Sequence, residues 1–181
     1  MMKAVTFDLW DTIVFDDSDE PKRRARGLRS KHDERRYLVW EALNRHAPIS
    51  REAVDLAYDV GAAAFNAVWH DQHVTWTIAA RLAVVLKGLG RTLPEDDLAG
   101  VIRAHETMEV EIFPDLIPGC GQALAELSQR FKLAVVSDAI VTPGSRLRDL
   151  LELHGVRQYF SALAFSDEVG QLGRASCRER V

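Results

Sequence analysis

Three short apolar runs, each followed by serine or aspartate, constrain the fold of this chain most. Residues 3–8 read KAVTFD, residues 131–138 read FKLAVVSD, and residues 159–170 read YFSALAFSDEVG. Short apolar runs bounded by polar or turn-forming residues are typical of buried strands. Helical patterns separate the runs, and such alternation indicates a parallel sheet. We therefore predict an α/β fold with an incomplete parallel sheet of about three strands.

The segment between the first two predicted strands has the pattern of a helical insertion. Apolar residues recur at helical spacing over most of residues 20–110, and we find no strand signal there. Proline and glycine then punctuate residues 113–121, where the pattern changes. We predict an α/β core from residues 1–14 and 115–172, with a helical domain from residues 15–114 inserted into it.

Charge and composition exclude several classes of protein. The formal net charge is −4, which argues against a nucleic-acid-binding protein. No apolar stretch approaches the roughly 20 residues of a membrane helix, and the N-terminus lacks the layout of a signal peptide. The two cysteines have neither a disulfide framework nor metal-ligand spacing. We expect a cytoplasmic protein with no membrane or nucleic-acid partner, and leave its oligomeric state open.

The last nine residues, 173–181, differ from the rest of the chain. They read GRASCRERV, with three arginines and no apolar period. Their back-translation closely resembles a common sequencing adapter. We therefore expect a non-native tail at the end of a truncated fragment.

Polar residues gather after the predicted strands. In open parallel sheets, the carboxyl ends of the strands share one edge, where ligands bind. A carboxylate there can act as a nucleophile or bind a hard cation such as Mg²⁺, and a serine can hydrogen-bond a phosphoryl oxygen. The candidates are Asp8, Asp11, Thr12, Ser137, Asp138, Ser166, Asp167 and Glu168.

These segments together resemble the motifs of the haloacid dehalogenase (HAD) superfamily, in the subgroup with an α-helical C1-type cap. FDLWDT resembles the first motif, LAVVSD the second, and YFSALAFSDEVG the approach to the third. The resemblance implies a Rossmann-like core, Asp8 as the nucleophile and Ser137 as the phosphate-binding hydroxyl. It also implies a Mg²⁺ ion held by Asp8 and the backbone carbonyl of Trp10, with Thr12 and Asp138 binding substrate.

The sequence departs from the HAD pattern at two places. Trp10 stands where phosphatases of the family carry a second aspartate, the acid that protonates the leaving group. No lysine follows Lys132, so the third-motif lysine is missing, as are the fourth-motif acids. We expect the fragment itself to be inactive.

Three functions remain open for the full-length parent. The first is Mg²⁺-dependent hydrolysis of phosphate monoesters. The second is carbon–halogen hydrolysis, because dehalogenating members also lack the second aspartate and a halide leaves without protonation. The third is a non-catalytic member that binds phosphate or a partner.

A basic block covers residues 22–36, with eight lysines and arginines in fifteen positions. Such a block most often forms a solvated helix face. The sharper hypothesis is a rim that attracts a small anionic substrate through Arg23, Arg24 and Arg26.

Overall fold

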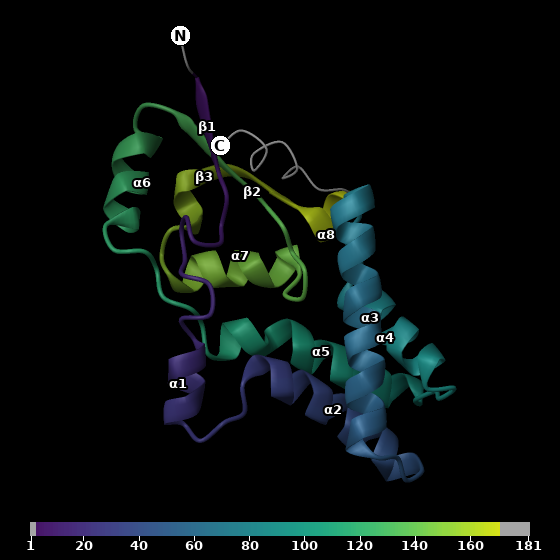
Figure 1. Cartoon of the computed structure of the whole chain (residues 1–181). Coiled ribbons are helices and arrows are strands. Elements are labelled where there is room, and N and C mark those ends of the chain that lie inside the picture. Colours follow the sequence, from purple (N-terminus) through teal and green to yellow (C-terminus); the bar gives the residue numbers. More distant parts are fainter. Residues whose placement is uncertain (1–2, 171–181) are drawn as a thin grey trace.

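A computed structural model describes residues 3–170 of the chain; the predicted tail at 173–181 lies outside the described residues. Three strands form one parallel sheet in the order β1-β2-β3 (Figure 1). They are β1 (Ala4–Phe7), β2 (Lys132–Ser137) and β3 (Phe160–Phe165). The prediction of an α/β fold with a three-stranded parallel sheet is therefore confirmed.

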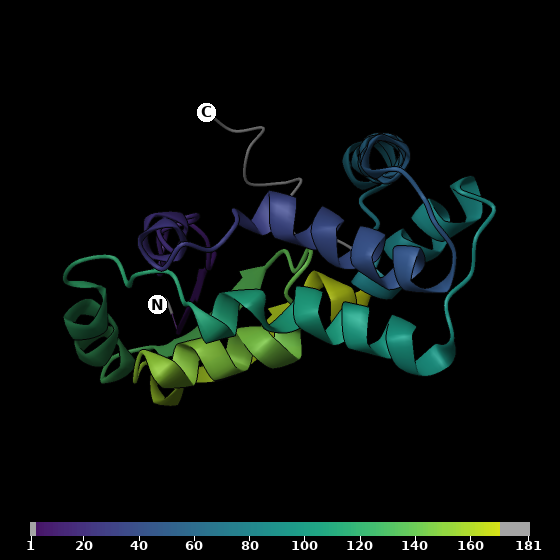
Figure 2. The same ribbon diagram turned by 90° about the horizontal axis from the view of Figure 1, so that it is seen from below.

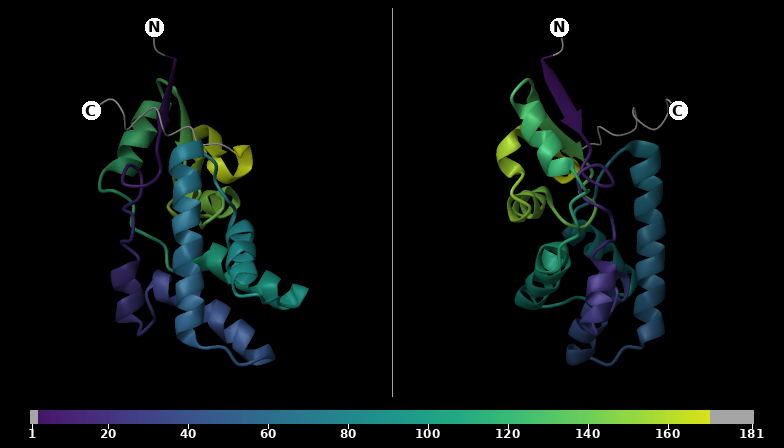
Figure 3. Two further views of the ribbon diagram at one scale, coloured as in Figure 1. Left: turned by 45° about the vertical axis from the view of Figure 1, so that its right-hand side comes forward. Right: turned by 90° about the vertical axis from the view of Figure 1, so that its left-hand side faces the viewer.

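Six helices lie between β1 and β2, and the first five of them form what we call the helical insert. Figures 1 and 3 show it beyond the carboxyl ends of the strands. The helices are α1 (Glu20–Ala25), α2 (Lys31–His46), α3 (Arg51–Gln72), α4 (Ile78–Gly88) and α5 (Glu95–Glu111). Ser30, Ser50 and Thr77 start three of them, because each hydroxyl accepts a hydrogen bond from a first-turn backbone N–H.

Three further helices and a 3₁₀ turn complete the described structure around the sheet. They are α6 (Cys120–Ser128), α7 (Gly144–Leu153), the 3₁₀ turn η1 (Arg157–Tyr159) and α8 (Ser166–Val169). Parallel strands need crossover segments such as α6, α7 and η1, because the chain must return to the same edge before the next strand begins.

The apolar residues form two separate clusters. One lies around the sheet and includes Leu9, Leu133 and Phe165. The other lies within the insert and includes Leu43 and Leu82. Each cluster excludes water on its own, so the insert has a hydrophobic core distinct from that of the sheet. The domain boundaries proposed from the sequence remain a prediction.

The insert contacts the rest of the chain at defined places. Helix α5 lies between α2 and α7 (Figure 2). The loop between β2 and α7 also reaches the insert: Val141 packs against its apolar cluster, and Arg81 donates a hydrogen bond to the Ile140 carbonyl at 3.2 Å. The insert is therefore held against the loop that follows the central strand.

None of the helices in the described part of the chain is long and apolar enough to cross a bilayer.

Candidate active site at the strand ends

Asp8 and Ser137 meet at the carboxyl edge of the sheet. Phe7 pairs with Val135, so the residues that follow β1 lie beside the end of β2. The Asp8 Oδ1 atom accepts hydrogen bonds from the Ser137 hydroxyl at 2.7 Å and from the Leu9 backbone N–H at 2.8 Å. These two bonds fix the carboxylate in a defined orientation at the sheet edge.

The Trp10 indole is tied to the neighbouring strand end. Its Nε1–H donates to the backbone carbonyl of Asp138 at 3.2 Å, and its ring packs against the apolar cluster of the sheet. Asp11 then adopts a left-handed conformation with φ of 52°, which aspartate tolerates better than most residues. Its Oδ1 atom accepts a hydrogen bond from the Asp16 N–H at 3.0 Å, which closes this turn.

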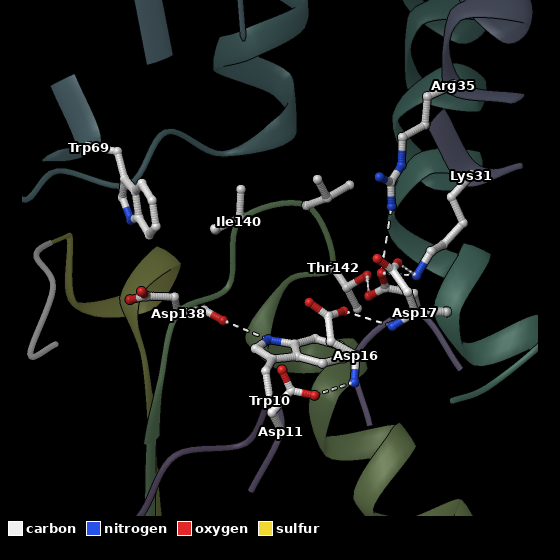
Figure 4. A pocket seen from close by; sticks show the side chains of 12 residues that line it. Trp10, Asp11, Asp16, Asp17, Lys31, Arg35, Trp69, Asp138, Ile140 and Thr142 are labelled. Carbon is white, nitrogen blue, oxygen red and sulfur yellow. Dashed lines mark hydrogen bonds and ion pairs between the residues drawn. The ribbon is translucent and has the colours of Figure 1, made fainter. Parts of the chain in front are cut away.

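A cavity of about 380 Å³ lies between the strand ends and the insert (Figure 4). Its lining contains five carboxylates, two cations, two tryptophans and three residues of the loop after β2. These residues are Trp10, Asp11, Asp16, Asp17, Lys31, Arg35, Trp69, Glu109, Asp138, Ile140, Val141 and Thr142. The volume suits a small molecule.

Lys31 forms a buried ionic network at the side of this cavity. Its Nζ atom lies 2.9 Å from Asp19 Oδ1 and 3.1 Å from both Asp17 Oδ1 and Glu109 Oε1. Burial disfavours the ammonium, but the surrounding carboxylates outweigh it and raise the pKa of Lys31. The Thr142 hydroxyl donates to Glu109 Oε2 at 2.5 Å. The network therefore joins α2, α5 and the loops that follow β1 and β2.

Among the residues of the cavity lining, Lys31, Arg35 and Glu109 were not predicted as site residues from the sequence. The i, i+4 spacing of Lys31 and Arg35 on one helix places both on one face, and this was an available signal. Glu109 gives no such signal, because its role depends on α5 packing beside α2.

The arginines predicted to bind an anion, Arg23, Arg24 and Arg26, are not among the residues that line this cavity. Arg23 is 4 % exposed, and its Nε–H donates to the Arg29 carbonyl at 3.0 Å. Arg24 and Arg26 are exposed on or beside α1. Arg23 thus stabilises the turn after α1, and the basic block reaches the cavity through Lys31 and Arg35 instead.

The remaining predicted substrate ligands divide between two places. Asp138 is 2 % exposed and lines the cavity. Thr12 is exposed and lines a second, mainly apolar hollow of about 340 Å³ beside the start of α6. Thr12 and Asp138 therefore do not share one cavity.

The polar residues after β3 bind neighbouring backbone and side chains. The Ser166 hydroxyl accepts from the Ala139 N–H at 3.0 Å, and the Asp167 carboxylate accepts from the Gly144 N–H at 3.1 Å. Burial raises the pKa of Asp167. Glu168 forms an ion pair with Arg148. These contacts position the loop after β2 and cap the start of α7.

The donor set expected for Mg²⁺ is incomplete in this part of the chain. Among residues 3–170, no group of three or more histidine, cysteine, aspartate or glutamate side chains is arranged to hold a metal ion. Asp8 and the Trp10 carbonyl would supply two oxygens, whereas Mg²⁺ demands near-octahedral coordination. The described residues therefore do not fit a complete Mg²⁺ site by themselves.

Comparison of the sequence with protein-family models and with curated proteins gives no match. Solved structures do match. A 2-haloacid dehalogenase from Pseudomonas syringae has a TM-score of 0.53 and 18% identity, over 94% of this chain and 66% of that chain. A HAD phosphatase from Thermococcus onnurineus has a TM-score of 0.52 and 19% identity, over 93% of this chain and 64% of that chain.

A magnesium-bound HAD-hydrolase from Bacillus subtilis has a TM-score of 0.49 and 18% identity, over 94% of this chain and 66% of that chain. The chain thus spans just under two thirds of the length of these three structures. The similarity to the dehalogenase and to the phosphatase shows that the chain has the fold of HAD-superfamily proteins.

Proposed function

We propose, from this HAD-superfamily fold and the residues at its strand ends, that the chain belongs to a hydrolase in which Asp8 is the nucleophile. One observation carries the proposal. The Asp8 carboxylate lies at the end of β1, where the Ser137 hydroxyl and the Leu9 N–H hold its Oδ1 atom. A carboxylate fixed at the ligand-binding edge of a parallel sheet suits covalent catalysis.

The proposed reaction has two steps. An Asp8 carboxylate oxygen attacks the electrophilic atom of the substrate, and the leaving group departs with the electron pair of the broken bond. Water then cleaves the aspartyl ester or acyl phosphate that has formed; this restores the Asp8 carboxylate, releases the alcohol or phosphate product and passes one proton of the water to solvent. Ser137 orients Asp8 for the first step through a hydrogen bond. It keeps its own proton throughout the reaction.

Hydrolysis of a phosphate monoester is the first candidate reaction. Ser137 is 5 % exposed and its hydroxyl lies beside Asp8, where it is suited to contact a phosphoryl oxygen during the attack. Mg²⁺ is the expected cofactor, with Asp8 and the Trp10 carbonyl as two of its ligands. Such an ion would supply positive charge beside the phosphoryl group.

Carbon–halogen hydrolysis is the second candidate, and Trp10 favours it. The indole is bonded to the Asp138 carbonyl and has no acidic proton to give to a leaving group. A halide leaves without a proton, so this reaction needs no general acid. A member that only binds phosphate or a partner is the third possibility.

The test uses the intact protein that carries this chain, assayed for phosphate release and for halide release. Asp8→Asn should lower the turnover number by roughly three orders of magnitude or more, because the nucleophile is lost. Asp149→Asn is the matched control, since Asp149 pairs with Arg146 on the surface of α7. It should leave turnover within about twofold, in keeping with the small effect of exposed ion pairs.

The products and the metal requirement separate the three functions. Phosphate release that stops on addition of EDTA supports the phosphatase reaction. Halide release that persists in EDTA supports the dehalogenase reaction. Neither product, with phosphate binding retained, would overturn the hydrolase proposal.

A further inference from the structure

We infer that Arg35 binds a second oxyanion of the substrate, a carboxylate or phosphate group away from the bond that breaks. The inference rests on the proposed function, because it takes the ligand of Arg35 to be the substrate of a hydrolase. The binding test below does not depend on that function. The residues that carry it are Arg35 and Lys31 on α2 and Trp69 on α3.

Lys31 and Arg35 are the two cations of the cavity lining, and only one of them has a full set of partners. The three carboxylates around Lys31 match the three N–H donors of an ammonium. Lys31 is therefore committed to holding the insert against the strand-end loops. It has no donor left for a ligand.

Arg35 is in the opposite situation. Its Nε and Nη2 atoms are buried, and within residues 3–170 neither has a hydrogen-bond partner. The closest carboxylate is that of Glu109, whose Oε1 atom lies 3.7 Å from Nη2, beyond hydrogen-bond distance. The Glu109 oxygens already accept from Lys31 and Thr142. Arg35 thus lines the cavity with two nitrogens that lack a hydrogen-bond partner among the described residues, and Figure 4 marks only its longer ion pair with a carboxylate.

A second unsatisfied donor lies on the other side of the cavity. The Trp69 Nε1 atom is also buried and, in the described part of the chain, has no hydrogen-bond partner. Figure 4 shows Trp69 and Arg35 on opposite sides of Ile140. Leaving buried N–H donors unpaired is costly, and a ligand with acceptor oxygens removes that cost.

The chemistry of the guanidinium group identifies the ligand class. Its N–H groups form a planar fork that matches a carboxylate or a phosphate in bidentate fashion. The cavity as a whole has five carboxylates against two cations, so its overall field does not attract anions. Recognition must be local, at Arg35, and a ligand with one oxyanion at this position fits better than a polyanion.

The binding test uses calorimetric titration with inorganic phosphate and, separately, with acetate. Arg35→Gln should weaken binding of the preferred ion about tenfold to a hundredfold, as expected for loss of a charge-assisted hydrogen bond. Arg35→Lys, which keeps the charge without the fork, should fall between Arg35→Gln and the wild type. Arg24→Gln is the matched control from the same basic block and should bind within about twofold of the wild type.

The affinities for acetate and for phosphate distinguish a carboxylate site from a phosphate site. The Ser137→Ala variant distinguishes binding at Arg35 from binding at the strand ends. Binding that Arg35→Gln weakens and Ser137→Ala does not supports the inference. Binding that Ser137→Ala abolishes and Arg35→Gln leaves unchanged overturns it. Equal affinities of Arg35→Gln and the wild type for both ions also overturn it.

An activity test on the intact protein then connects the site to the reaction. It compares kcat/KM for an alkyl phosphate with kcat/KM for the same compound bearing a terminal carboxylate. The wild type should prefer the carboxylate form, and Arg35→Gln should reduce that preference at least about tenfold. If the protein hydrolyses nothing, the proposed function fails, whereas the titrations still decide whether Arg35 binds an oxyanion.

Discussion

Trp10 lies two positions after the proposed nucleophile, and its indole is occupied by a hydrogen bond to the Asp138 carbonyl. An indole that is fixed in this way can shape the cavity but cannot protonate an alkoxide. The leaving group must therefore be stable as an anion or take its proton from water. The rate of the proposed first step should then depend steeply on the acidity of the leaving group.

Substitution of Trp10 tests this dependence. If the reaction is phosphate-ester hydrolysis, Trp10→Asp should raise the rate for alkyl phosphates by up to about a hundredfold, because it supplies a general acid. Trp10→Phe, which removes the indole N–H without adding an acid, should give no gain. The measurement is turnover across phosphate esters whose leaving groups differ in pKa. If turnover depends equally steeply on the pKa of the leaving group in the wild type and in Trp10→Asp, the lack of a general acid at position 10 does not explain that dependence.

His105 gives the insert a pH-dependent component of stability. The side chain is fully buried; its Nε2 atom lies 2.7 Å from the Tyr58 hydroxyl and its Nδ1 atom 2.8 Å from the Val101 carbonyl. Burial lowers the pKa of His105 to about 4, from 6.5. The folded protein therefore binds fewer protons than the unfolded chain between these values, and the stabilisation present above pH 6.5 is lost as the pH falls towards 4.

Urea unfolding at pH 7 and at pH 4.5 measures this loss. His105 should account for a decrease of at most about 3 kcal/mol in the free energy of unfolding. His105→Gln should show a smaller decrease between the two pH values than the wild type. His70→Gln is the control, because His70 is exposed at the end of α3. An identical decrease in His105→Gln and in the wild type would refute the prediction.

At the scale of elements, α7 and β3 approach each other at a single glycine. A Cβ atom on Gly144 would lie 2.6 Å from Phe165 Cδ2 and 2.8 Å from Phe165 Cβ. The Gly144 N–H also donates to the Asp167 carboxylate. The start of α7 can therefore be capped by the segment after β3 only because this position has no side chain.

Two glycine substitutions separate close packing from helix propensity. Gly144→Ala should destabilise the protein by about 1–3 kcal/mol, because the methyl group overpacks the contact with Phe165. Gly100→Ala, in α5 with nothing within 4 Å of the added Cβ, should stabilise it by up to about 1 kcal/mol. Thermal unfolding of both variants is the measurement. Equal melting temperatures for the two variants would show that Phe165 moves away from the added methyl group without loss of stability.

The strands and the helical insert were predictable because local patterns specify them. The runs KAVTFD, FKLAVVSD and SALAF are short and mainly apolar, which is typical of strands, although Ala4 and Thr6 of β1 are exposed in the structure. Their polar ends then predicted that Asp8 and Ser137 would meet. By contrast, the sequence hypothesis for Arg23, Arg24 and Arg26 depended on charge density alone. Density along the chain does not tell which side of a short helix faces a cavity.

For the whole molecule, the arrangement at the cavity depends on contacts between distant segments. Lys31 forms a hydrogen bond with Glu109, 78 positions away. Thr142, in the loop between β2 and α7, donates a hydrogen bond to the same carboxylate. No periodicity or motif encodes such a meeting. The sequence could therefore predict the core side of the site, at Asp8 and Ser137, but not the side formed by the insert.

The placement of the insert between β1 and β2 also affects the order in which the molecule can fold during synthesis. Ala4 pairs with Lys132, so β1 leaves the ribosome long before its partner exists. At typical rates of synthesis this delay is roughly 6 to 25 seconds, far longer than helices need to form. The insert, with its own apolar cluster, can therefore fold first. The nascent β1 strand then waits as an unpaired apolar segment, and chaperone binding at this stage would favour correct pairing.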